Sequence, residues 1–206
     1  MTPEEYRANP CGTLSIPYWK AKHVQIPEHM RIVHHRDYEK TAHPAYQDTP
    51  YFRLQHDLTK IPNIQAAGIA ILSVGSEDIP QLVDVINRCY EDLTVTEAQL
   101  QGYTQTEAYC PALWIAAVDT STAQMVGCGI ADLDRELEEG ILEWIQVLPG
   151  YRGRKIGQQM VCTLLQRMRP IARFATVSGK CRDSVPEALY RKCGFQGNDI
   201  WHILRK

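Results

Sequence analysis

The chain has 206 residues, of which 44% are hydrophobic and 22% charged, so it can bury a sizeable core and is not disordered throughout. Its 22 basic and 24 acidic residues give a net charge of −2, which argues against a nucleic-acid-binding protein. No apolar run is long enough to span a bilayer, no signal peptide follows Met1, and the seven cysteines include no CxxC pair. We therefore expect a cytoplasmic protein without a membrane or nucleic-acid partner.

Residues 1–66 differ in composition from the rest of the chain. They contain six of the seven histidines and seven of the twelve prolines, and because proline interrupts helical hydrogen bonding they cannot form a long helix. A short hairpin is expected over residues 23–33 and a strand over residues 51–54. We expect an ordered N-terminal extension, residues 1–66, packed on a main domain of residues 67–206.

Helices and strands alternate from residue 67 onward. Short apolar or alternating runs predict strands, and apolar residues at three- and four-residue spacing predict helices. The predicted strands are residues 68–74, 113–118, 125–133, 141–147, 174–178 and 199–204. The predicted helices are residues 76–89 with Ser76 as the cap, 96–102, 156–169 and 186–193. Gly127 and Gly129 indicate a bulge or a close backbone approach. This order predicts a mixed α/β fold with a mainly antiparallel central sheet and flanking helices.

The segment from Val147 to Gln159 runs from a buried strand through a basic, glycine-containing turn into a helix. The first N–H groups of a helix lack partners within it, and the helix dipole attracts anions there. Arg and Lys add charge-assisted contacts, so the pattern predicts a phosphate or pyrophosphate site. The alternative is an ordinary surface turn with solvated basic side chains.

At these residues the chain resembles the GNAT superfamily of acyl-CoA-dependent N-acyltransferases, whose signature is [RQ]-x-x-G-x-[GA] after a V-x-P strand exit. Arg152 and Gly157 match the first and last motif positions, and Val147 and Pro149 match the exit. Residues 188–195, ALYRKCGF, are similar to a second family segment. Lys155 departs from the family by replacing its middle glycine. Asp183 departs by replacing an asparagine that many members have.

The resemblance implies acetyl-CoA as co-substrate and no metal. It implies that the backbone of one strand holds the acyl-pantetheine arm, while the turn and the start of the helix hold the phosphates. The strand residues are Ile145, Gln146 and Val147. The phosphate-loop residues are Arg152, Gly153, Arg154, Lys155, Ile156, Gly157 and Gln158.

Two residues are candidates for proton transfer. Glu143 is the candidate base, because strict alternation would put it on the same face as Ile145 and Val147 and a dry cleft would raise the pKa of a carboxylate. The alternative is a salt-bridged surface residue. Tyr190 matches the family tyrosine and is the candidate acid toward the coenzyme A sulfur, the alternative being an aromatic core residue.

Two further clusters have weaker functional interpretations. A cluster of five acidic residues is expected in a turn, where it forms either a solvated surface or a region that attracts a cationic amine. The cluster comprises Asp132, Asp134, Glu136, Glu138 and Glu139. Histidines 23, 29, 34, 35, 43 and 56 lack the spacing of a metal site, so a metal-binding protein is only a third hypothesis.

The resulting prediction is an acyltransferase that moves an acetyl group from acetyl-CoA directly to a primary amine of a small molecule or a protein. The alternative is a catalytically silent acyl-CoA-binding or sensing module with the same fold. The acceptor is not specified by any motif. Homodimers are common in the resembled family, so a homodimer is an expectation to test.

Overall fold

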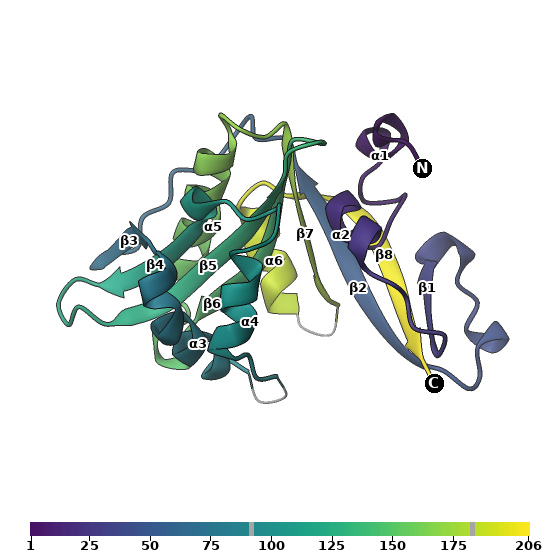
Figure 1. The fold of residues 1–206 in the computed structure, drawn as a ribbon, viewed down its shortest axis with the longest axis horizontal. Helices are drawn as coiled ribbons and strands as arrows, with labels where there is room; N and C mark the ends of the chain where they lie inside the picture. The colour runs from purple at the N-terminus through teal and green to yellow at the C-terminus, as the bar shows by residue number, and fades with distance from the viewer. Residues whose placement is uncertain (91–92, 182–183) are drawn as a thin grey trace. The chain divides into compact units, whose positions relative to one another are not determined.

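The computed structural model describes residues 1–90, 93–181 and 184–206, and it divides into two compact units (Figure 1). The central unit comprises residues 57–175. The terminal unit comprises residues 1–56 together with residues 176–206. Among the described residues, no helix is long and apolar enough to cross a bilayer.

Four strands and three helices form most of the central unit. Strands β3 (Ile69–Ser73), β4 (Trp114–Asp119), β5 (Met125–Asp134) and β6 (Glu139–Val147) lie in the order β6-β5-β4-β3, each antiparallel to its neighbour. The helices are α3 (Ile79–Asn87), α4 (Glu97–Tyr103) and α5 (Ile156–Met168), with short 3-10 turns η3 (Ser76–Asp78), η4 (Pro111–Leu113) and η5 (Pro149–Tyr151).

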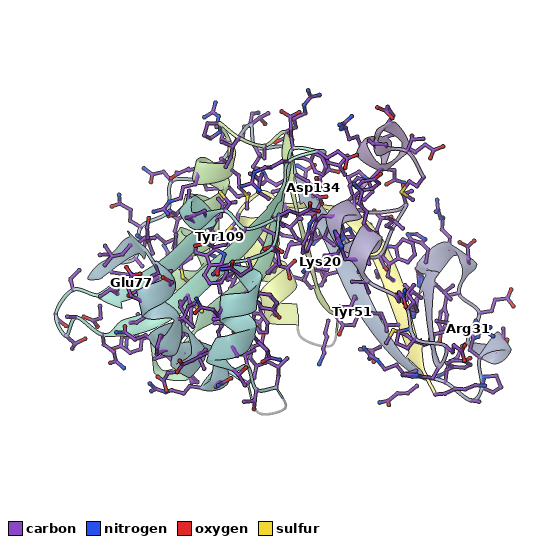
Figure 2. The ribbon with its side chains drawn as sticks, in the orientation of Figure 1. Lys20, Arg31, Tyr51, Glu77, Tyr109 and Asp134 are labelled. Atoms are coloured by element: carbon purple, nitrogen blue, oxygen red, sulfur yellow. The ribbon has the colours of Figure 1, made fainter. Side chains whose placement is uncertain are left out.

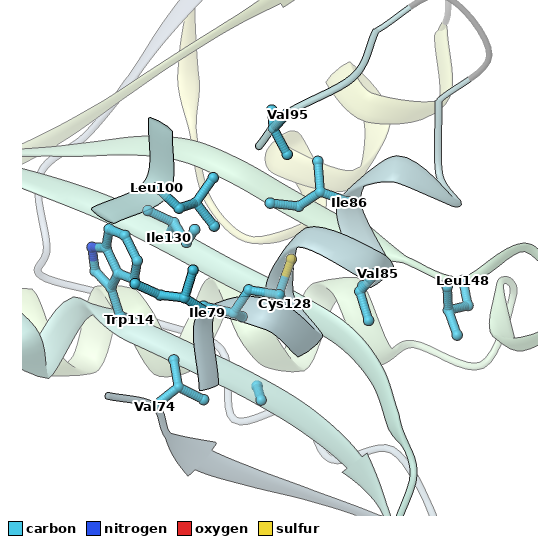
Figure 3. Close-up of a cluster of buried hydrophobic side chains, with 12 residues drawn as sticks. Val74, Ile79, Val85, Ile86, Val95, Leu100, Trp114, Cys128, Ile130 and Leu148 are labelled. Atoms are coloured by element: carbon cyan, nitrogen blue, oxygen red, sulfur yellow. The ribbon is translucent and has the colours of Figure 1, made fainter. Parts of the chain in front are cut away.

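The two faces of this sheet carry different helices. The apolar face of α3 packs with α4 against β4 and β5, in a buried cluster that includes Leu82, Ile86, Leu100 and Ile130 (Figure 3). Burying a side chain of this size contributes about 1.5–3 kcal/mol. On the opposite face, a Cβ added at Gly129 would lie 3.2 Å from an atom of α5. The bulge or close backbone approach predicted from Gly127 and Gly129 is confirmed at Gly127, where an added Cβ would lie 2.7 Å from the Gln146 carbonyl oxygen and β4 and β5 shift register beside it.

The helix cap predicted at Ser76 is wrong, and the structure has a cap at α4 that was not predicted. Thr96 caps α4, where its side chain accepts a hydrogen bond from the Gln99 N–H at 3.2 Å. Ser76 does not cap α3, because η3 intervenes and Asp78 is the N-cap residue. The Asp78 carboxylate instead accepts the Gly75 N–H at 2.9 Å, which the apolar spacing alone could not reveal.

The acidic residues expected in one turn are divided between two strands and the turn. Asp134 ends β5 and Glu139 begins β6, and both are buried at 4% and 0% exposure (Asp134 is labelled in Figure 2). One Asp134 oxygen accepts the N–H groups of Glu136 and Leu137 at 3.0 and 3.1 Å. These hydrogen bonds close a turn of four residues, 135–138, so β5 and β6 extend into the acidic segment that was expected to be a turn.

The terminal unit contains strands from both ends of the chain. β1 (Met30–His34), β8 (Gln196–Arg205), β2 (Gln47–His56) and β7 (Phe174–Lys180) follow one another in that order, and β8 is antiparallel to both β1 and β2. β7 begins at the end of the central unit. The helices are α1 (Pro3–Ala8), α2 (Tyr18–His23) and α6 (Ser184–Lys192), with 3-10 turns η1 (His35–Asp37) and η2 (Lys40–Ala42).

The hairpin predicted over residues 23–33 is wrong. Residues 18–23 form α2, and β1 pairs with β8 instead of with a neighbouring segment. The strand predicted at residues 51–54 lies within β2 and is confirmed. Because β1 and β2 pair with the C-terminal strand, this unit joins residues of the predicted extension to residues of the predicted main domain; the domain boundaries themselves stay a prediction.

A buried arginine fixes the N-terminal segment to this unit. Arg53 on β2 is 1% exposed. Its guanidinium donates to the Tyr6 hydroxyl at 2.8 Å, the Pro10 carbonyl at 3.1 Å and the Ser178 hydroxyl at 3.3 Å. These bonds link residues before α2 to β2 and β7.

The predicted fold class, a mixed α/β fold with a mainly antiparallel sheet and flanking helices, is confirmed. The predicted strands and helices after residue 67 all have counterparts in the described elements, with ends shifted by a few residues.

Candidate active site

The loop between β6 and α5 has the backbone of a glycine-rich turn. Gly153 and Lys155 both have left-handed dihedral angles, with φ of 80° and 64°. Lys155 is the N-cap residue of α5, and no side chain caps this helix. A Cβ added at Gly150 or Gly153 would meet nothing within 4 Å. The loop therefore has open backbone next to an uncapped helix N-terminus.

The predicted phosphate-loop residues lie together along this turn. Arg152, Gly153, Arg154 and Lys155 are exposed, Ile156 and Gly157 are buried in the first turn of α5, and Gln158 is half-buried.

Two guanidinium groups of this loop are hydrogen-bonded to nearby backbone carbonyls. Arg152 Nε donates to the Val147 carbonyl at 3.1 Å, and Arg154 donates to the Gly150 carbonyl at 3.3 Å. The Arg154 guanidinium also lies 4.9 Å from the centre of the Tyr151 ring. The arrangement presents two positive charges beside the start of α5, which suits an anionic group.

The segment that follows α3 lies against the same loop and strand. Burial raises the pKa of the Cys89 thiol, and the nearby Arg152 guanidinium opposes that rise. The Tyr90 hydroxyl accepts a hydrogen bond from the Gln146 side chain at 2.6 Å. An open cavity of about 460 Å³ adjoins the loop, lined by Arg88, Gln124 and residues 148–151. No sequence motif marks this segment, since its residues follow an ordinary amphipathic helix.

The three predicted strand residues lie on β6 opposite the end of β5. Ile145, Gln146 and Val147 pair with Gly129, Cys128 and Gly127. A Cβ added at Gly127 would lie 3.2 Å from Met160 of α5. Because paired residues point to the same face, Ile145 and Val147 face α5.

Glu143 lies at a β-bulge in β6. Trp144 stands opposite Ile130, whereas Leu142 stands opposite the next residue, Ala131, so Glu143 is the extra residue. Its neighbours point to opposite faces, since Trp144 packs against the cluster under α3. The alternation that was expected to align Glu143 with Ile145 and Val147 is broken at Glu143 itself. The role of Glu143 stays a prediction.

Tyr190 lies on α6 in the terminal unit, whereas the loop and Glu143 belong to the central unit. It is 8% exposed, and its ring centre is 6.2 Å from that of Phe52 and 5.7 Å from that of Phe195. Tyr190 is thus a member of an aromatic cluster, and its catalytic role stays a prediction. Asp183, the second departure from the family motif, lies outside the described residues.

The histidine-rich segment lies in the terminal unit. In the parts of the chain that the structure describes, no three His, Cys, Asp or Glu side chains are grouped so that they could hold a metal ion.

Comparisons with known proteins identify a family for part of the chain. Residues 111–197, from η4 to the start of β8, match the family model described as an acetyltransferase (GNAT) domain. This range includes Glu143, the β6–α5 loop and Tyr190. No curated protein sequence matches the chain.

Several solved structures share the fold. A GCN5-related N-acetyltransferase from Sphaerobacter thermophilus has a TM-score of 0.71 and 20% identity, over 91% of this chain and 63% of that one. A glucosamine N-acetyltransferase region of a fungal multi-domain β-N-acetylglucosaminidase has a TM-score of 0.62 and 13% identity, over 79% of this chain and 21% of that one. The ribosomal-protein-S18-alanine N-acetyltransferase from Escherichia coli has a TM-score of 0.53 and 19% identity, over 66% and 91%.

The chain spans less than two thirds of the length of the Sphaerobacter protein. These identities establish a shared fold, and the family match establishes the kind of domain. Residues 111–197 belong to the GNAT superfamily of acetyltransferase domains, and the chain has the GNAT fold.

Proposed function

We propose that this chain transfers an acetyl group from acetyl-CoA to a primary amine of a small molecule or a protein. The observation that carries the proposal is the β6–α5 loop, in which left-handed residues, two tethered arginines and an uncapped helix N-terminus lie within the family match. We further propose that the protein acts in the cytoplasm without a metal, a membrane or a nucleic acid, and that it can form a homodimer.

The loop has the chemistry that a diphosphate requires. Exposed Arg152, Arg154 and Lys155 supply positive charge. Gly150 and Gly153 leave the backbone open to a close approach, because an added Cβ at either position meets nothing. The uncapped start of α5 adds backbone donors and the positive end of a helix dipole. These residues fit the phosphates of acetyl-CoA.

The remaining roles follow from the chemistry of amine acylation. Bound acetyl-CoA supplies an activated thioester. In the proposal, backbone groups of Ile145, Gln146 and Val147 orient the acyl arm, and Glu143 accepts the proton that the attacking amine loses. Tyr190 donates a proton to the sulfur that leaves. A base is needed because an alkyl amine with a pKa near 10.4 is almost fully protonated at neutral pH.

The binding step is tested by reversing charge in the loop. The double variant R152E/R154E should weaken acetyl-CoA binding at least tenfold, or about 1.4 kcal/mol, as measured by calorimetry. The matched control is Lys60→Glu, because Lys60 is an exposed cation in the same unit outside the loop. Equal affinities for the loop variant and the wild type would remove the phosphate site from the proposal.

The alternative, an acyl-CoA-binding module without turnover, is favoured by two observations. Lys155 occupies a left-handed position where the family motif has glycine, and Tyr190 is packed among aromatic rings. A free-thiol assay with acetyl-CoA against amines, polyamines, aminoglycosides and peptides separates the two functions. Thiol release that depends on an amine supports transfer, whereas tight binding without release supports the silent module.

A further inference from the structure

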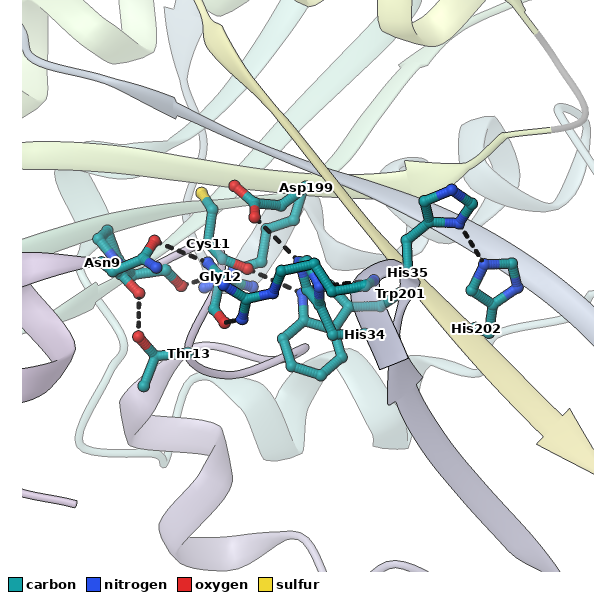
Figure 4. A network of polar contacts seen from close by, with 12 residues as sticks. Asn9, Cys11, Gly12, Thr13, His34, His35, Asp199, Trp201 and His202 are labelled. Carbon is teal, nitrogen blue, oxygen red and sulfur yellow. Dashed lines mark hydrogen bonds and ion pairs between the residues drawn. The ribbon is translucent and has the colours of Figure 1, made fainter. Parts of the chain in front are cut away.

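Three side chains of the terminal unit form a hydrogen-bonded chain that the proposed function does not use. His202 Nδ1 on β8 lies 3.0 and 2.9 Å from the two oxygens of Asp48 on β2. On its other side, His202 Nε2 lies 3.0 Å from Nδ1 of His35 in η1 (Figure 4). His202 is 6% exposed, whereas His35 reaches the surface. The hydrogen-bonded series therefore runs from the Asp48 carboxylate through the buried His202 ring to the exposed His35 ring.

The two imidazoles are linked edge to edge. Their planes differ by 20° and their centres are 5.3 Å apart, too far for stacked faces but suited to an in-plane N–H···N bond. Tyr38 supplies the stacked contact instead, with its ring centre 3.7 Å from that of His202 and its plane 12° away. Burial raises the pKa of the Tyr38 hydroxyl, and so does the Asp48 carboxylate to which it is hydrogen-bonded.

The positions of the protons follow from these contacts. An ionised carboxylate only accepts hydrogen bonds, so His202 Nδ1 carries a proton. When His202 is neutral, its Nε2 is an acceptor, and His35 Nδ1 must donate. The outer nitrogen of His35 is then unprotonated and directed away from the pair.

The hydrogen-bonded series Asp48–His202–His35 can take up one proton without losing a hydrogen bond. If His202 becomes an imidazolium, its Nε2–H donates to His35 Nδ1, and the outer nitrogen of His35 carries the remaining proton. The adjacent Asp48 carboxylate balances the charge. A second extra proton would charge both rings, and two N–H groups would then face each other across the 3.0 Å contact. The hydrogen bond between His35 and His202 would be lost.

The other titratable groups near these three side chains are His34, Asp37, His43 and Cys181, the last of which lies near Asp48. The partners of His202 in the neighbouring strands, Val33 and Pro50, do not titrate. His34 has separate partners: its Nδ1 accepts the Arg36 N–H at 3.2 Å, so its Nε2 donates to Asp199 at 3.0 Å. The Arg36 side chain donates to the Gly12 carbonyl at 3.5 Å. Asp37 is exposed on the same turn as Arg36. The His43 ring centre lies 6.3 Å from that of Tyr38.

We propose that Asp48, His202 and His35 form a proton-sensitive clasp. It binds one proton with its hydrogen bonds intact and opens on binding a second, which releases residues 35–38 from β8. Opening therefore requires acid, because the second proton must bind to a pair that already carries one. The inference does not depend on acyl transfer.

The test is an imidazole nitrogen NMR titration of the full chain from about pH 8 to about pH 5, a range above the usual titration of carboxyl groups. His35 and His202 should titrate as a coupled pair, with both rings responding to the first proton. Amide hydrogen exchange over residues 34–38, corrected for its intrinsic pH dependence, should rise about tenfold as the clasp opens.

His35→Asn is the variant that decides the question, since His35 is the exposed ring of the clasp and its replacement removes no buried side chain. It should abolish the acid-induced rise in exchange. The control His29→Asn removes an exposed histidine outside the clasp and should retain the rise. Independent titration of His35 and His202, or an equal rise in His35→Asn, would overturn the proposal.

Discussion

Replacing Lys155 with glycine should stabilise the protein. Lys155 has φ of 64°, where a side chain with a Cβ costs about 1–2 kcal/mol. Glycine adopts this conformation freely, but it also raises the entropy of the unfolded chain by about 0.4–1 kcal/mol. The difference is about 0–1.6 kcal/mol and is centred near 0.8 kcal/mol of stabilisation, which corresponds to about 2–3 °C in Tm for a protein of this size.

Lys155→Ala is the matched control. Alanine removes the ammonium but keeps the Cβ and the left-handed strain, so the difference between the two variants isolates the backbone effect. Urea unfolding followed by circular dichroism gives both free energies, and calorimetry separates the transitions if the two units unfold independently. If Lys155→Gly is no more stable than Lys155→Ala, the strain argument is wrong.

Three further predictions concern packing, catalysis and pH. Gly129→Ala should destabilise the protein by about 1–3 kcal/mol in urea unfolding, because the added Cβ would lie 2.9 Å from an atom of the Ile115 side chain. Gly102→Ala on α4 should stabilise the protein by about 0.5–1 kcal/mol, because the added Cβ has no atom within 4 Å. Tyr190→Phe should lower kcat about 10²-fold, with acetyl-CoA affinity unchanged, if the hydroxyl is the acid; an unchanged kcat would make Tyr190 a packing residue. Hydrogen bonds from Ser121 lower the pKa of Asp119 in the folded protein. The ionised Asp119 carboxylate therefore stabilises the fold above the usual carboxyl pKa of about 3.9, and this stabilisation is lost as the pH falls through the lower pKa of the folded state. The stability difference between wild type and Asp119→Asn in urea should therefore be larger at pH 7 than in acid, and a constant difference would contradict this linkage.

Local patterns predicted most of the central unit. The apolar spacing of α3 and α5 reflects burial on one side, and the short apolar runs of β4 and β5 reflect burial on both faces. The sequence displays both patterns directly. The basic loop was also predictable, since a strand exit, a glycine-containing turn and a helix start follow one another within a few residues.

Features that depend on distant segments were not predictable. β1 pairs with a strand some 170 residues away, and no local signal distinguishes that partner from a neighbouring hairpin. The bulge at Glu143 breaks an alternation that the sequence suggests is continuous. The left-handed conformation of Lys155 is likewise hidden, because lysine ordinarily avoids it. The face of Glu143 depends on this bulge, and the surroundings of Tyr190 include Phe52 from the distant strand β2.

The pairing in the terminal unit has a consequence for synthesis on the ribosome. β8 lies between β1 and β2, so these strands cannot complete their sheet until residues 196–205 have emerged. The central unit is continuous in sequence and can close earlier. At about 5–20 residues per second, the interval between the translation of β2 and that of β8 is about 7–30 s. During that time the N-terminal segment, with its apolar residues and strand edges unpaired, is the part of the nascent chain most exposed to chaperones and to aggregation.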